Sequence, residues 1–212
     1  QAQTGDACGA NDSGCSLASP KGKVVRLAKD FLDFGLYTNN LDGMLDFWQN
    51  TVGLPFEEML PTGGGGRQHR HGLNGAVMKI NHSRDPLPDE PAAGYSELLI
   101  RRDGIDEVQR FTDPDGNLVS LVPAGYRGVT SAGMVVLVGS LERARAYYGG
   151  ALQLDEIEPG TFRCGGSLVL LEEDPGRPMA GEIRAPGYRY MTVQVWDCDA
   201  EFAAIVAKGG TA

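Results

Sequence analysis

The sequence contains no uninterrupted apolar run of the roughly 18 or more residues that indicate a membrane-spanning helix. It is also poor in positive charge, with 19 lysines and arginines against 28 aspartates and glutamates and a net charge of −9. No basic patch interleaved with aromatic residues offsets this balance, which argues against a nucleic-acid partner. We therefore expect a cytoplasmic protein that binds neither membranes nor nucleic acids and takes a small molecule as its ligand.

Cysteine and histidine, two common metal ligands, are scarce. The four cysteines, Cys8, Cys15, Cys164 and Cys198, include no Cys-x-x-Cys pair, so the sequence does not favour a structural zinc site. A reduced, buried thiol is the simpler interpretation for Cys164 and Cys198, whereas a Cys8–Cys15 disulfide stays open. All three histidines fall within residues 67–82, which makes that segment the natural place to look for a metal site.

Glycine, by contrast, is abundant, with 30 residues gathered in short clusters that are typical of a turn-rich β protein. The cluster Gly63–Gly66 lacks the Lys-Ser/Thr of a phosphate-binding P-loop, so we interpret it as a flexible lip. The first residues, 1–24, are rich in Gly, Ser, Asp and Ala and lack the apolar core of a signal peptide. We expect 1–29 to be a flexible leader.

An internal repeat organises the rest of the chain. LDGMLDFWQNTVGL (41–54) aligns without a gap with LERARAYYGGALQL (141–154), and both place apolar residues at helical spacing. A strand-like segment precedes each predicted helix, at 31–38 and at 132–139. The same strand therefore precedes the same helix at an offset of 100 residues.

Two weaker copies of this strand-then-helix pattern bring the number of units to four. The four units, separated by Pro-rich or Gly-rich connectors, are 31–84, 95–123, 132–174 and 188–212. Each unit opens with a predicted strand.

Two segments carry a resemblance to a known family. FGLYTNNLDGMLDFWQNTVGLPFEEML (34–60) is similar to the opening of a glyoxalase-like module. FTDPDGNLVSLVP (111–123) is similar to the closing hairpin of such a module, in which Asp-Pro-Asp-Gly-Asn makes the turn. The chain from residue 30 onward thus resembles the vicinal oxygen chelate superfamily of glyoxalases, bleomycin-resistance proteins and extradiol dioxygenases.

The resemblance implies an α+β fold of tandem βαβββ modules, in which paired curved mixed sheets enclose a cleft and the helices lie outside. We expect two paired modules, 30–123 and 132–212. The second would stop before the last hairpin that the family has, and an open sheet of this kind is compatible with a homodimer.

The resemblance also indicates where a metal would bind. In metal-using members, His and Glu from the first and last strands of two modules hold a divalent ion that polarises a substrate oxygen. The matching positions of 30–123 hold Asp33, Lys79, Glu97 and Ser120. Because a lysine opposes a metal, only Asp33 and Glu97 remain as weak ligands. One divalent ion there is compatible with the pattern, but no cofactor is the favoured interpretation.

The histidine-rich segment 67–82 has its own geometry. Its central Asn-Gly pair favours a two-residue hairpin turn. That turn pairs Arg70 with Lys79 and places His69 and His71 on the opposite face, away from the expected cleft. A three-residue loop would shift the pairing by one residue, exchange the two faces of the hairpin and turn the two histidines into the cleft.

The leading functional interpretation is a glyoxalase-like lyase or isomerase acting on a small organic molecule in the cleft of 30–123. Asp33 or Glu97 would be the general base, with Lys79 and Arg70 orienting the substrate. The further expected substrate contacts are Tyr37, His69, His71 and Ser120. The alternative is a non-catalytic protein that binds or sequesters a small molecule, as bleomycin-resistance proteins do, because most metal positions are replaced.

Overall fold

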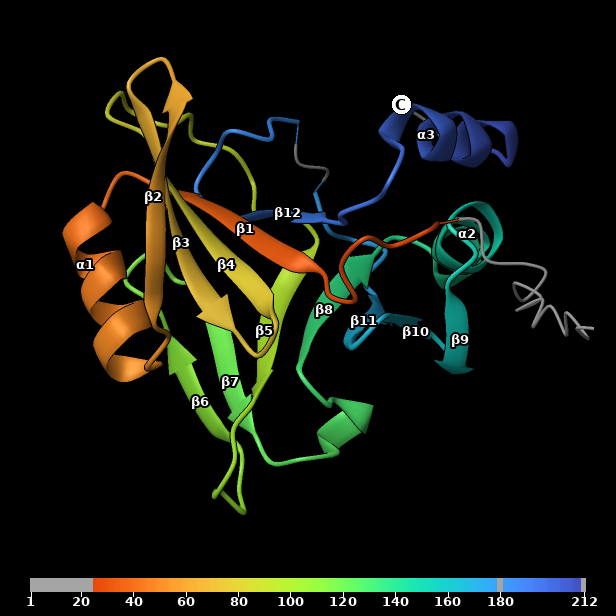
Figure 1. The fold of residues 1–212 in the computed structure, drawn as a ribbon, viewed down its shortest axis with the longest axis horizontal. Coiled ribbons are helices and arrows are strands. Elements are labelled where there is room, and N and C mark those ends of the chain that lie inside the picture. The colour runs from red at the N-terminus through yellow and green to blue at the C-terminus, as the bar shows by residue number, and fades with distance from the viewer. Residues whose placement is uncertain (1–24, 179–180, 211–212) are drawn as a thin grey trace, which may run out of the picture.

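The computed structural model describes residues 25–178 and 181–210, and its strands form two β-sheets (Figure 1). The strands of the five-stranded sheet are β1 (Asp33–Thr38), β2 (Phe56–Gly63), β3 (Gly66–Leu73), β4 (Ala76–His82) and β12 (Gly187–Thr192). The strands of the seven-stranded sheet are β5 (Tyr95–Arg101), β6 (Gln109–Thr112), β7 (Leu118–Val122), β8 (Ala132–Val138), β9 (Asp155–Glu158), β10 (Thr161–Cys164) and β11 (Ser167–Glu173). Both sheets mix parallel and antiparallel neighbours, as the α+β prediction requires.

The helices are few and short. They are α1 (Leu41–Asp46), α2 (Leu141–Arg145) and α3 (Cys198–Ala207), with a 3₁₀ turn at Tyr126–Gly128. A π-helical turn extends α1 over Phe47–Thr51, and another extends α2 over Ala146–Ala151. No helix among the residues described is long and apolar enough to cross a membrane.

The two strong copies of the repeat form the same strand, capped helix and π-helical turn. The side chain of Asn40 caps α1, and that of Ser140, 100 residues later, caps α2. At the other end of α1, the Val52 N–H donates to the carbonyl of Phe47 at 2.9 Å. The equivalent bond 100 residues later, from Leu152 to Tyr147, has the same length. The predicted repeat is confirmed.

The way in which the units associate differs from the expectation. The first unit shares its sheet with the fourth, because β1 pairs antiparallel with β12. The second unit joins the third, because β5 pairs antiparallel with β8. The first sheet thus combines 31–84 with the start of 188–212, and the second combines 95–123 with 132–174, whereas we expected 31–84 to pair with 95–123 and 132–174 with 188–212. Every unit opens with the same kind of strand, so the repeat alone does not select the partner.

One continuous core joins the two sheets. It contains Phe34 and Leu36 of β1, fully buried, together with Trp48 of the π-helical turn after α1. Leu98 and Ile100 of β5 belong to the same cluster. The apolar face of β1 is therefore covered, and its other face is left to polar side chains.

The two predicted hairpins are confirmed. Strands β3 and β4 meet through a two-residue turn whose residues, Asn74 and Gly75, have φ of 48° and 93°. The resulting register pairs Arg70 with Lys79, as expected from the Asn-Gly turn. In the second hairpin, between β6 and β7, the Asp113 carboxylate accepts hydrogen bonds from the backbone and side chain of Asn117.

The predicted leader falls mainly on residues 1–24, outside the described residues, as does the Cys8–Cys15 pair. The remaining part, 25–29, is anchored to the fourth unit. Leu27 forms a β-bridge with Val195, and the Arg26 side chain forms an ion pair with Glu201 at 3.0 Å.

Candidate functional site

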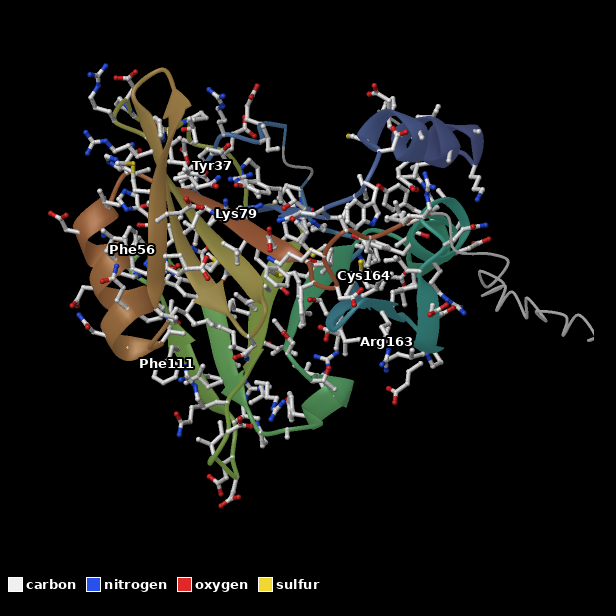
Figure 2. All side chains as sticks on the ribbon, viewed as in Figure 1. Tyr37, Phe56, Lys79, Phe111, Arg163 and Cys164 are labelled. Atoms are coloured by element: carbon white, nitrogen blue, oxygen red, sulfur yellow. The ribbon has the colours of Figure 1, made fainter. Side chains whose placement is uncertain are left out.

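The face of the five-stranded sheet opposite the core is polar. Successive residues of a strand point to opposite sides of the sheet, so every second residue of each strand lies on this face. Its members, here called the polar face, are Asp33, Tyr37, Glu58, Gln68, Arg70, Lys79, Asn81, Tyr190 and Thr192. Figure 2 shows Tyr37 and Lys79 near β1, with Phe56 beside α1. Five strands contribute to this face, and two of its residues come from β12, the strand of the fourth unit.

Asp33 is the centre of the polar face. Its carboxylate is 1% exposed, and its Oδ1 accepts hydrogen bonds from Lys29 Nζ at 2.6 Å and from the Val77 N–H at 3.0 Å. Its Oδ2 lies 3.1 Å from Lys79 Nζ, which also donates to the Thr192 hydroxyl at 2.7 Å. A buried carboxylate is costly unless it is paired, and here two ammonium groups pair it.

Tyr190 spans the middle of the polar face. Its hydroxyl accepts hydrogen bonds from the side-chain amides of Asn81 at 2.8 Å and Gln68 at 3.4 Å. Burial raises the pKa of this phenol, against the lowering effect of the Asn81 hydrogen bond. The ring crosses over Gly35 so closely that a Cβ there would lie 2.1 Å from the ring carbon Cζ. Tyr37 meets the ring edge-on, with centroids 6.1 Å apart.

The histidines do not join the polar face. His71 is fully buried on the opposite side of β3, where its Nε2 lies 3.1 Å from Gln49 Nε2 and its ring meets Phe56 edge-on. Burial lowers the pKa of His71 to about 4 and lowers that of His69 as well. The structure thus groups Arg70 and Lys79 with Asp33, and separates His69 and His71 from them.

Glu97 and Ser120 lie in the other sheet, on β5 and β7. The Ser120 hydroxyl donates to Glu97 Oε1, and Arg110 Nε lies 3.5 Å from the same oxygen. Asp33 and Glu97 therefore belong to different sheets and have different partners. The expected cleft of 30–123, in which both would act together, is not assembled because β5 pairs with β8.

The donor set does not fit a divalent metal. The position that resembles a last-strand ligand holds the Lys79 ammonium, which lies against the Asp33 carboxylate. Among the residues that the structure describes, no three His, Cys, Asp or Glu side chains come close enough together to hold an ion. A hard cation needs several oxygen or nitrogen ligands at once, and the two carboxylates of this face, Asp33 and Glu58, are already ion-paired with Lys29, Lys79 and Arg70.

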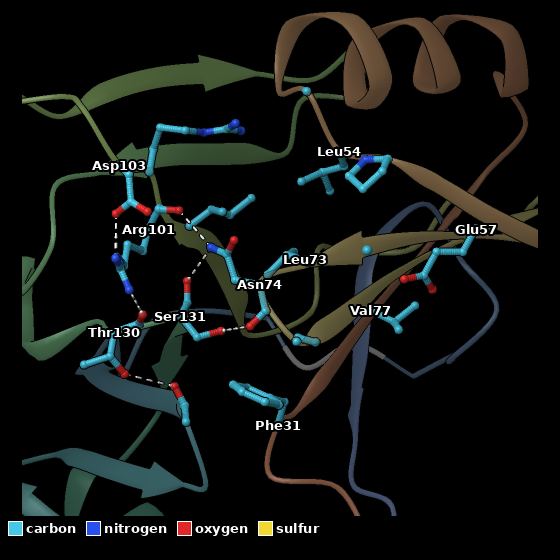
Figure 3. A pocket seen from close by; sticks show the side chains of 18 of the residues that line it. Phe31, Leu54, Glu57, Leu73, Asn74, Val77, Arg101, Asp103, Thr130 and Ser131 are labelled. Carbon is cyan, nitrogen blue, oxygen red and sulfur yellow. Dashed lines mark hydrogen bonds and ion pairs between the residues drawn. The ribbon is translucent and has the colours of Figure 1, made fainter.

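A cavity of about 1030 Å³ adjoins the polar face (Figure 3). Its wall includes Lys29 and Val77, the two residues that donate to Asp33 Oδ1. The hairpin turn forms another side, held to the seven-stranded sheet by the Asn74 amide, which donates to the Arg101 carbonyl at 2.8 Å. Cavities of this size accommodate small organic ligands. The buried carboxylate is thus connected to this cavity through Lys29 and Val77, which line the cavity and donate to Asp33.

The predicted site residues do not include Glu58, Gln68 and Asn81 of the polar face, nor Lys29, Tyr190 and Thr192. Lys29 lies in the segment predicted to be a leader. Its spacing of four residues from Asp33 is the only sign in the sequence that the two side chains could pair. Tyr190 and Thr192 were assigned to the other paired module, and the sequence gives no signal that β12 would join β1.

Solved structures share the fold of this chain. Glyoxalase I from Zea mays superposes with a TM-score of 0.63 at 14% identity, over 88% of this chain and 81% of that one. Two mutant forms of the same enzyme give TM-scores of 0.65 and 0.66 at 13% identity. The chain has the vicinal oxygen chelate fold. No family model and no curated protein matches the sequence. The vicinal oxygen chelate fold is thus established by structure, and at this identity it leaves the chemistry to be argued from the site.

Proposed function

We propose that this vicinal oxygen chelate protein binds a small organic anion at the polar face, beside the adjoining cavity, without a divalent metal. Its role would be binding or sequestration rather than metal-assisted catalysis. The observation that carries the proposal is the Asp33 carboxylate held between the ammonium groups of Lys29 and Lys79.

Those ammonium groups take the electrostatic place of a metal. Both are largely shielded from solvent, with side-chain exposures of 21% for Lys29 and 13% for Lys79. Coulomb interactions are stronger in such surroundings than in water, so a divalent ion brought to Asp33 would meet strong repulsion from two fixed cations. A ligand with negative charge would meet attraction.

The remaining charges favour an anion too. Arg70 of the polar face is paired with Glu58 at 3.0 Å, so Arg70, Lys79 and the adjoining Lys29 make three cations against two carboxylates. This local excess is opposite in sign to the net charge of −9 of the whole chain. Arginine and lysine donate charge-assisted hydrogen bonds to carboxylates, the stronger class of hydrogen bond. The polar face is therefore suited to a small carboxylate.

The enzyme interpretation would use Asp33 as general base. A base must reach the proton that it removes with a free lone pair. Oδ1 of Asp33 already accepts two hydrogen bonds, whereas Oδ2 accepts none but forms an ion pair with Lys79 at 3.1 Å, and the carboxylate is almost fully buried. We therefore favour binding over proton abstraction.

The test is a binding screen on the purified protein in buffer that contains EDTA. Small mono- and dicarboxylates are followed by NMR line broadening, and hits are measured by isothermal titration calorimetry. Lys79→Met and Arg70→Gln remove cations of the polar face, and Arg143→Gln removes an exposed arginine of α2 as the matched control. We expect binding in EDTA that weakens about tenfold or more in the first two variants, since a charge-assisted hydrogen bond contributes about 1.5–3 kcal/mol.

Two results would contradict the proposal. One is carboxylate binding that appears only after a divalent metal is added. The other is binding in EDTA that is equally strong in Lys79→Met, Arg70→Gln and the Arg143→Gln control. Turnover of a bound ligand in EDTA would restore the enzyme interpretation.

A further inference from the structure

The glycine turn between β2 and β3 lies beside a second hollow, of about 540 Å³. Its lining includes Arg67, His82 and Arg84, with Met59 and Pro61 as an apolar wall. This hollow is distinct from the polar face. Arg67 and His82 oppose each other across β3 and β4, and strand alternation points them to the side away from Lys79.

The basic side chains around this hollow lack close partners. Within the described part of the chain, Arg67 and His82 make no side-chain hydrogen bond or ion pair. Arg84 has one loose contact, with Asp85 at 3.7 Å, and the two side chains are 74% and 75% exposed. In a chain of net charge −9, this hollow therefore has one arginine without a partner and one with only a loose partner, and both can pair with an added anion.

A third arginine lies on the other side of the same turn. Arg184 lines a smaller hollow, of about 70 Å³, that shares Gly63, Gly66 and His82 with the larger one. Positive charge thus surrounds the turn on both sides.

The turn itself offers backbone donors. Gly63, Gly64 and Gly65 have φ of 79°, 57° and 79°, a run of left-handed backbone that only glycine adopts without strain. The N–H groups of Gly64 and Gly65 have no hydrogen-bond acceptor within the described residues. The Arg84 guanidinium lies over the turn, since a Cβ on Gly65 would be 3.4 Å from its Cζ. Adjacent free N–H groups in a turn form a concavity that binds anions.

We propose that this turn is a phosphate-binding site for a small phosphorylated molecule. The phosphate would lie between the guanidinium groups of Arg67 and Arg84 and the N–H groups of Gly64 and Gly65. Arginine is suited to this role because its planar fork donates two parallel hydrogen bonds to phosphate. The organic part of the ligand would lie along Met59 and Pro61.

This site is independent of the proposed function at the polar face, because the two share no cation. The test uses the complete chain with inorganic phosphate and phenyl phosphate as probes. Both are titrated by isothermal titration calorimetry at one constant, low ionic strength. The variants are Arg67→Gln, Arg84→Gln and their combination, with Arg143→Gln as the matched control. Each replaced arginine is exposed or outside the core, so thermal unfolding checks that all variants fold alike.

We expect one equivalent of phenyl phosphate to bind more tightly than inorganic phosphate, because its ring buries the apolar wall. Each single variant should weaken this binding about tenfold, the loss of one charge-assisted contact, and Arg143→Gln should leave it unchanged. The proposal is overturned if neither probe binds, or if all variants bind phosphate as the unmodified chain does. A chain that binds phenyl phosphate but no carboxylate in EDTA would contradict only the function proposed for the polar face.

Discussion

Replacing Gly35 by alanine tests the contact between β1 and β12 on which the polar face depends. The new Cβ would lie 2.1 Å from Cζ of Tyr190 and within 2.5 Å of both adjoining ring carbons, far inside van der Waals contact. The ring must swing away, and its hydroxyl then loses the amide donors Asn81 and Gln68. Forcing extra volume into a packed site costs about 1–3 kcal/mol. For a chain of this length each kcal/mol lowers Tm by roughly 2–4 °C.

A double-mutant cycle identifies the cause of that loss. In a Tyr190→Ala background the obstacle is gone, so Gly35→Ala should cost less than about 0.5 kcal/mol. In a Tyr190→Phe background the ring remains but the hydroxyl is gone, so Gly35→Ala should keep its steric cost and lose only the part that comes from the Asn81 and Gln68 hydrogen bonds. Urea unfolding of the six proteins measures all three costs. A Gly35→Ala chain as stable as the unmodified one, or a cost that persists in Tyr190→Ala, would refute the pairing of β1 with β12.

Three further predictions concern stability. Asp33→Asn leaves the ammonium groups of Lys29 and Lys79 without a counter-charge and should lower the free energy of unfolding by about 3 kcal/mol in urea titrations; a loss below about 1 kcal/mol would contradict the pairing described. His71 has a folded pKa of about 4, below the value of 6.5 for the free side chain, so the unfolded chain takes up its proton first as the pH falls. Up to about 3 kcal/mol should be lost between pH 6.5 and 4, and His71→Gln should lose less over that range; equal pH profiles would refute the assignment. Gln153 has φ of 52° where the first repeat has glycine, so Gln153→Gly should raise stability by up to about 1 kcal/mol, and a lowered Tm would contradict this.

The elements that local chemistry determines could be predicted from the sequence. The Asn-Gly turn fixed the register that puts Arg70 opposite Lys79, because a two-residue turn leaves no freedom in the pairing. The offset of 100 residues predicted the first residue of both helices, Leu41 and Leu141, each of which follows a capping residue. These features depend on residues that are neighbours in the sequence.

The site could be predicted only in part, because its assembly depends on long-range pairing. Asp33, Arg70 and Lys79 were recognised as one group, since a single module contains them all. Tyr190 and Thr192 were not, because the sequence of a strand does not determine which other strand it will pair with. Lys29 was missed because it precedes the first strand. In the structure its Nζ forms an ion pair with Asp33 Oδ1 at 2.6 Å.

The central claim is that fixed ammonium groups, and not a metal, accompany the Asp33 carboxylate. Titration of the EDTA-treated protein with Mn²⁺, followed by calorimetry and by the loss of the free-ion electron paramagnetic resonance signal, tests it most directly, with Asp33→Asn as the comparison. The account predicts that the unmodified chain and Asp33→Asn take up Mn²⁺ equally weakly, because Lys29 and Lys79 repel the ion from this position. One equivalent of Mn²⁺ that binds the unmodified chain and is lost in Asp33→Asn would contradict it.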